Sequence, residues 1–209
     1  ERLHVEGEHS RFVRMQPFFA PGPRAAGPPP VWLGAVGPAM TALAGEAADG
    51  MFSHPTNTSP RYLREVVRPR LTQGAARCGR SAAEVSLLAS PLGATGRDDA
   101  AVAERREWAR GLLGFLYSTP AYWHSLELHG WGERGEVLRE HTRAGRWEEM
   151  AAVVDDDMLA AFVPVASYEK VAALLAEWFG GLCGALTFPL PDDPADEPAV
   201  AEVVARLQA

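Results

Sequence analysis

Three residues between an apolar run and a helical pattern could bind an anion. The run 31–36 is partly β-branched and bounded by prolines, which is typical of a buried strand, and Pro38 suits the first position of a helix. The free N–H groups and the dipole of that helix would point at Val36, Gly37 and Pro38, and a residue without a side chain at Gly37 lets a phosphate approach the backbone. A Gly-Pro pair after a strand is more often only a tight turn, and the spacing alone favours that interpretation.

His54 is the most suggestive titratable side chain. It follows a second short strand, predicted over Met51–Ser53, and begins a polar segment, 54–58, that ends before the next helix. At the carboxyl end of a barrel strand an imidazole could contact a ligand. A single histidine in a loop is also common as a surface or capping residue, so both roles are open at this point.

The sequence predicts no metal site. His124 and His129 are five residues apart and lack the glutamate of an HExxH pattern, and neither Cys78 nor Cys183 fits a zinc pattern. The acidic triplet 155–157 lacks the spacing of a calcium loop. We expect it to begin a helix, where negative charge is favourable.

Strands and helices alternate four times along the chain. Strands are predicted over 31–36, 51–53, 85–92 and 183–190. Helical patterns begin at Pro38 and Pro60, cover most of 98–162 with breaks near 119–120, 130–132 and 145, and return over 167–179 and 199–207. Pro69 should kink the second helix. Such alternation predicts parallel neighbouring strands with helices on one outer face.

Two α/β architectures fit this alternation, a doubly wound sheet and a TIM (β/α)8 barrel. Four βα units are too few to close a barrel, but they would form its second half. We interpret 1–209 as a single domain, in which the Pro- and Gly-rich segment 1–30 is an extended connector and 31–209 hold the βα units. Trp108 and Phe115 are expected to pack helices onto the sheet.

Composition limits the classes of function. The chain has 209 residues, 47% of them hydrophobic, so it can bury a sizeable core. A net charge of −7 argues against a nucleic-acid partner, and no apolar stretch is long enough to span a membrane. The opening residues are too charged for a signal peptide, so we expect a cytoplasmic protein. They also look like the middle of a domain, which suggests a fragment.

The string PPPVWLGAVGPAMTALAGEAADGMF resembles a segment of the luciferase-like monooxygenase superfamily, the flavin and deazaflavin oxidoreductases. That segment is a strand, an Ala/Gly-Gly-Pro turn, a helix ending in Ala-Gly-x-x-Ala-Asp-Gly, and a second strand. The opening EGEHSRFVRMQPFF is similar to the connector of the same family, so the resemblance covers nearly the whole chain. It implies a TIM barrel that binds FMN or coenzyme F-420, of which this chain is the carboxyl-terminal half.

The resemblance also implies where the cofactor would bind. Val36, Gly37 and Pro38 would offer backbone amides to the cofactor phosphate, and the segment from His54 to Asn57 would lie nearby. Some deazaflavin-dependent relatives carry a Gly-Gly pair at Val36-Gly37 and a lysine near Asn57, and this chain lacks both. His54, Arg97 or the missing half would then have to compensate. The catalytic acid/base residues of the family come mainly from the amino-terminal strands, so none is assigned here.

The function implied is hydride transfer between coenzyme F-420 and a small organic substrate, because the cofactor carries the chemistry and the protein positions the substrate. An FMN-dependent two-component monooxygenase is the alternative within the same class. A catalytically incompetent, flavin-binding half-barrel is the alternative of another class. The expected partners are a small-molecule substrate and either a second copy of the chain or an amino-terminal half-barrel.

Overall fold

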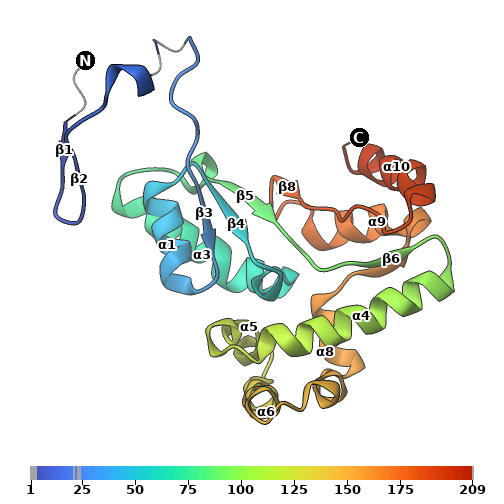
Figure 1. Ribbon diagram of the computed structural model, residues 1–209. Coiled ribbons are helices and arrows are strands. Elements are labelled where there is room, and N and C mark those ends of the chain that lie inside the picture. The colour runs from blue at the N-terminus through green and yellow to red at the C-terminus, as the bar shows by residue number, and fades with distance from the viewer. Residues whose placement is uncertain (1–3, 21, 23–24, 209) are drawn as a thin grey trace.

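A four-stranded parallel sheet organises the fold (Figure 1). The computed structural model describes residues 4–20, 22 and 25–208. The strands are β3 (Trp32–Ala35), β4 (Gly50–Ser53), β5 (Ser86–Ala89) and β8 (Ala185–Leu186), and they lie in the order β3-β4-β5-β8. All three pairings are parallel, so the predicted arrangement is confirmed.

The last two strands are shorter than the predicted ranges 85–92 and 183–190. Pro91 and Pro189 have no N–H group to donate to a neighbouring strand, which accounts for the early end of β5 and β8. Hydrogen bonds from Gly184 N to Leu87 O and from Thr187 N to Ala89 O, both 3.0 Å long, still hold the chain beside β5 on either side of β8.

Helices cover one face of this sheet. Helix α1 (Pro38–Ala47) follows β3, and a longer helical segment follows β4. That segment consists of α2 (Pro60–Tyr62), a π-helical turn over Leu63–Val67 and α3 (Arg68–Arg77), so the helix changes form directly before Pro69, where the sequence predicts a kink. Helices α9 (Tyr168–Phe179) and α10 (Glu197–Gln208) cover the β5–β8 side, and the main apolar core lies between these helices and the sheet.

A helical insertion separates β5 from α9 and has an apolar core of its own. It comprises α4 (Asp99–Tyr117), α5 (His124–Leu128), α6 (Gly132–Arg143), α7 (Met150–Val153) and α8 (Asp156–Phe162), as the pattern of one long and several shorter helices predicts. Gly130 and Gly145 adopt positive φ at the predicted breaks, and Asp155 caps α8. At its base β6 (Ala94–Gly96) pairs in parallel with β7 (Val165–Ser167), a second small sheet that the sequence analysis did not predict.

Two expectations about packing need revision. Trp108 and Phe115, expected between helix and sheet, are 50% and 53% exposed on α4. The buried face of α4 is made instead by Ala109, Leu113, Gly114 and Tyr117. The segment 1–30, predicted as an extended connector, holds in its described part an antiparallel hairpin of β1 (Val5–Glu6) and β2 (Arg11–Phe12) and a 3-10 turn over Pro17–Phe19.

Helices α1 and α3 approach each other closely at two glycines. A β-carbon at Gly74 would lie 1.8 Å from the carbonyl oxygen of Ala42, and one at Gly45 would lie 2.2 Å from that of Leu71. Both contacts are with backbone, which cannot rotate away as a side chain can. The pair of glycines therefore sets the distance between the two helices that support β3 and β4.

We expect Gly74→Ala to lower the free energy of unfolding by about 2 kcal/mol, because the added methyl group overpacks the interface. Gly111→Ala is the matched control, since open space surrounds Gly111 on α4. It should be neutral or stabilising by up to about 1 kcal/mol through helix propensity. Urea denaturation measures both, and equal stabilities would contradict the close approach.

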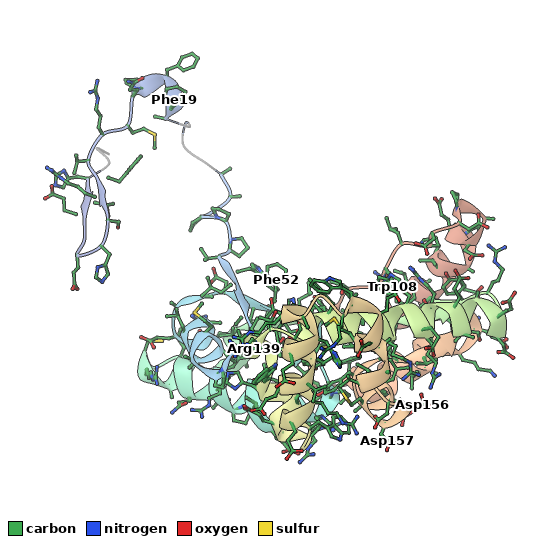
Figure 2. All side chains as sticks on the ribbon, turned by 60° about the horizontal axis from the view of Figure 1, so that its bottom comes forward. Phe19, Phe52, Trp108, Arg139, Asp156 and Asp157 are labelled. Atoms are coloured by element: carbon green, nitrogen blue, oxygen red, sulfur yellow. The ribbon has the colours of Figure 1, made fainter. Side chains whose placement is uncertain are left out.

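The other face of the sheet has no covering layer in the described structure. The register places Gly34, Phe52, Leu88 and Ala185 in one row across the four strands. Phe52, labelled in Figure 2, lies on this face. It is 42% exposed, and the centroid of the Trp32 ring lies 5.1 Å from that of the Phe52 ring. β3 and β8 are both edge strands. This is the arrangement of half a barrel, with the inward side chains and both edges free.

We expect the 209-residue chain on its own to pair with another copy, aggregate or stay loosely packed. Replacing Phe52 and Leu88 together by serine should reduce association, whereas Phe115→Ser, a similarly exposed aromatic on α4, should not. Light scattering after size exclusion measures the mass. A stable wild-type monomer would show that the uncovered face needs no partner.

Candidate functional site

The junction of β3 and α1 has the geometry that the anion-binding hypothesis requires. Gly37 is the N-cap in an extended conformation, with φ −89° and ψ 166°, and Pro38 is the first helical residue, as predicted. The Gly37 carbonyl accepts hydrogen bonds from the Thr41 backbone N–H and hydroxyl, each 3.0 Å long. Among the described residues no side chain caps this end, so the first-turn amides, including that of Ala39, keep their hydrogen-bonding capacity for a ligand.

Asn57 fastens this junction to the end of the neighbouring strand. Its side chain is 2% exposed, and its Nδ2 donates to the carbonyl oxygens of Ala35 and Val36, both at 2.9 Å. Its Oδ1 accepts from the backbone N–H of His54 at 2.6 Å. The amide thus clamps the carboxyl ends of β3 and β4 together and keeps the two chain segments in register.

His54 caps the short 3-10 turn over Pro55–Asn57, so the capping role that the sequence left open is observed. Its Nδ1 lies 2.8 Å from the Thr56 hydroxyl, and its ring stacks on Tyr122 at 4.6 Å with 21° between the planes. Partial burial lowers the pKa of His54 below its ordinary value. A ring at this position can still contact a ligand through Nε2, and the cofactor contacts of Val36, Gly37, Pro38, His54 and Asn57 stay predictions.

The insertion contributes a residue to this site that the sequence analysis considered only as a metal ligand. His124, at the start of α5, reaches over the turn, and its Nε2 would lie 3.4 Å from a β-carbon at Gly37. Its Nδ1 lies 3.5 Å from the Glu127 carboxylate. No local signal could have revealed this contact, because it depends on how the insertion packs against the sheet.

One hydrogen bond attaches the insertion to the end of β4, and a second joins two aromatic residues of the insertion itself. The buried Tyr117 hydroxyl donates to the Thr56 carbonyl at 3.1 Å, and the Trp123 indole N–H donates to the Tyr117 carbonyl at 2.6 Å. Thr56, on the β4 side, is fully buried at this contact. The aromatic residues after α4 therefore position the segment that carries Tyr122 and His124.

Arg97 does not serve the site. Its guanidinium pairs with Asp193 and lies 3.1 Å from Asp196, beside the loop before α10. The proposed compensation for the missing lysine therefore finds no support in this side chain. Among the described residues, no group of three metal-binding side chains comes together, and no helix has the length and apolarity needed to cross a membrane.

Residues 1–182 match the family of luciferase-like monooxygenases. The chain belongs to this family. A protein of Mycobacterium tuberculosis, itself uncharacterised, is 41% identical over 174 residues, which are 83% of this chain and 51% of that protein. The 5,10-methylenetetrahydromethanopterin reductase of Methanopyrus kandleri is 31% identical over 134 residues, which are 64% of this chain and 36% of the reductase. This luciferase-like chain thus spans about half the length, or less, of these curated relatives.

Solved structures show the same fold. The coenzyme F-420-dependent tetrahydromethanopterin reductase from Methanopyrus kandleri superimposes with a TM-score of 0.65 at 26% identity, covering 84% of this chain and 48% of that one. A coenzyme F-420-dependent secondary alcohol dehydrogenase, solved with a coenzyme–acetone adduct, gives 0.63 at 18% identity, with 100% and 56% covered. The expected architecture, the carboxyl-terminal half of a luciferase-like TIM barrel, agrees with this half coverage.

We expect Asn57→Ala to lower the free energy of unfolding by about 3 kcal/mol, because it leaves two carbonyls and one N–H without their buried partner. Gln73→Ala is the control, since this exposed amide only accepts a bond from Arg70 on the surface of α3. It should change stability by less than about 0.5 kcal/mol. Urea denaturation of both variants checks this, and a small effect at Asn57 would mean that the clamp is dispensable.

Proposed function

We propose that this chain is the carboxyl-terminal half of a cytoplasmic oxidoreductase that transfers a hydride between coenzyme F-420 and a small organic substrate. The observation that carries the proposal is the uncapped amino terminus of α1 at Gly37, held beside His54 by the Asn57 clamp. The names of the Methanopyrus kandleri reductase and of the alcohol dehydrogenase support coenzyme F-420 as the cofactor.

The residues present fit a phosphate group. Gly37 has no β-carbon to block the approach of a phosphate. Its backbone is extended and unstrained. The donors are backbone amides at the helix start and the imidazoles of His54 and His124. The only lysine of the sequence, Lys170, lies on α9, so the helix dipole and N–H groups would carry phosphate recognition on this side.

The cofactor and the residues of this chain would have different roles. When bound, the cofactor supplies the hydride chemistry. In this chain the Gly37 turn would hold the phosphate, and the Asn57 clamp keeps that turn in register with His54. From the insertion, Tyr122 lies against the His54 ring and His124 lies over Gly37. No acid/base residue is assigned in this half. We place the catalytic groups in an amino-terminal half-barrel that would also cover Phe52 and Trp32.

The prediction for the turn is that Gly37→Val weakens cofactor binding about tenfold or more with little loss of stability. A side chain there blocks the approach of a phosphate, whereas the backbone conformation suits any residue. Equilibrium titration of coenzyme F-420 by fluorescence, on the barrel completed by an amino-terminal half, measures the affinity.

Gly111→Val is the matched control for that titration, because a β-carbon at Gly111 on α4 would meet open space. The same titration with FMN separates the two cofactors, because the one with the lower dissociation constant is the one the turn accepts. Unchanged affinity of Gly37→Val for both would mean that the turn is only structural and that the chain is a half-barrel without this site.

A further inference from the structure

We infer that Thr56 fixes His54 in the tautomer that carries its proton on Nε2, so that His54 offers one neutral N–H donor to an oxygen atom of the ligand. Thr56 is thereby a positioning residue, as is Tyr122, which holds the plane of the ring. The inference deepens the proposed function and rests on it for the ligand, but the tautomer itself is a property of the chain alone.

Two donors of Thr56 converge on the same ring nitrogen. Its backbone N–H lies 3.4 Å from His54 Nδ1, and its hydroxyl oxygen lies 2.8 Å from the same atom. A backbone N–H can only donate, so it requires a lone pair on Nδ1, and the hydroxyl can rotate to donate as well. A neutral imidazole whose Nδ1 accepts carries its proton on Nε2.

Thr56 cannot easily move away from this position. Its side chain is 0% exposed, and its carbonyl accepts the hydrogen bond from the Tyr117 hydroxyl at 3.1 Å. The insertion therefore locks the residue from one side while the 3-10 turn locks it from the other.

The main chain and ring of His54 are equally fixed. Its N–H donates to Asn57 Oδ1 and its carbonyl accepts from the Thr58 hydroxyl at 2.7 Å, while the Tyr122 ring lies against its face. Among the residues that the structure describes, Nε2 is the polar atom of His54 without a hydrogen-bond partner. Partial burial lowers the pKa of the ring and so favours the neutral form.

A neutral donor next to the Gly37 turn has a chemical consequence. It can bond a phosphate or carbonyl oxygen without giving up or taking a proton. The other tautomer would present a lone pair at Nε2 and repel the same oxygen. Selecting the tautomer is therefore a way to select ligands with an acceptor at this position.

The tautomer can be measured on the barrel completed by an amino-terminal half and free of cofactor, by long-range proton–nitrogen spectra of the imidazole rings, with His54→Gln used to assign the signals. The wild type should show the pattern of an Nε2-protonated ring. Thr56→Val removes the hydroxyl donor and should give a mixture of tautomers, and Thr56→Ser should restore the wild-type pattern. Thr58→Val is the matched control, because Thr58 bonds the His54 carbonyl and not its ring.

A wild-type ring protonated on Nδ1 would overturn the inference, as would a Thr56→Val spectrum identical to that of the wild type. The ligand step is tested separately with coenzyme F-420 as the probe, on the completed barrel. Thr56→Val should weaken binding about fivefold, the cost of about one hydrogen bond, and Thr56→Ser should recover it. If the wild type has its proton on Nε2 but does not bind coenzyme F-420, the proposed function is contradicted and the tautomer assignment still holds.

Discussion

The buried amide of Asn57 is the interaction on which the site depends. Its Nδ2 donates to two carbonyls at the end of β3 and its Oδ1 accepts from one N–H at the end of β4, where the ladder between the strands stops. Parallel strands fray where their ladder ends, and a side chain that bonds both ends removes that freedom. The positions of Gly37 on one strand end and His54 on the other are thereby set by one residue rather than by two independent loops.

Most of the sheet could be predicted from the sequence because its signals are local. Pro38 and Pro60 mark helix starts, Gly37 and Ser59 stand at the N-cap positions, and apolar runs precede them, so the order strand–turn–helix needs no tertiary information. The parallel order of the strands then follows from alternation and handedness alone. The capping role of His54 could also be considered from the sequence, because capping involves only residues within three positions of His54.

The parts that could not be predicted depend on contacts between distant segments. His124 and Tyr122 reach the strand ends only because Tyr117 and Trp123 attach the insertion there. Arg97 is engaged by Asp193 and Asp196, and Asp193 lies 96 residues further along the chain. Trp108 and Phe115 are exposed although their apolar character predicted burial. The face of α4 that meets the core is the one that carries Ala109, Leu113, Gly114 and Tyr117. Periodicity identifies a helix but does not say which neighbour its face meets.

The two faces of the sheet support different functions: the covered face supports the Gly37 turn, and the uncovered face is where a barrel would close. Helices α1 and α3 pack against each other at Gly45 and Gly74 and together cover one face of β3 and β4, so the Gly37 turn lies at the end of the covered face. The row through Phe52 and Leu88 lies on the uncovered face, where a barrel places the opposing layer of side chains. Holding a ligand at the turn and closing a barrel around it are thus supported by different contacts. A change on one face, such as a polar residue at Phe52, should affect closure while leaving the Asn57 clamp intact.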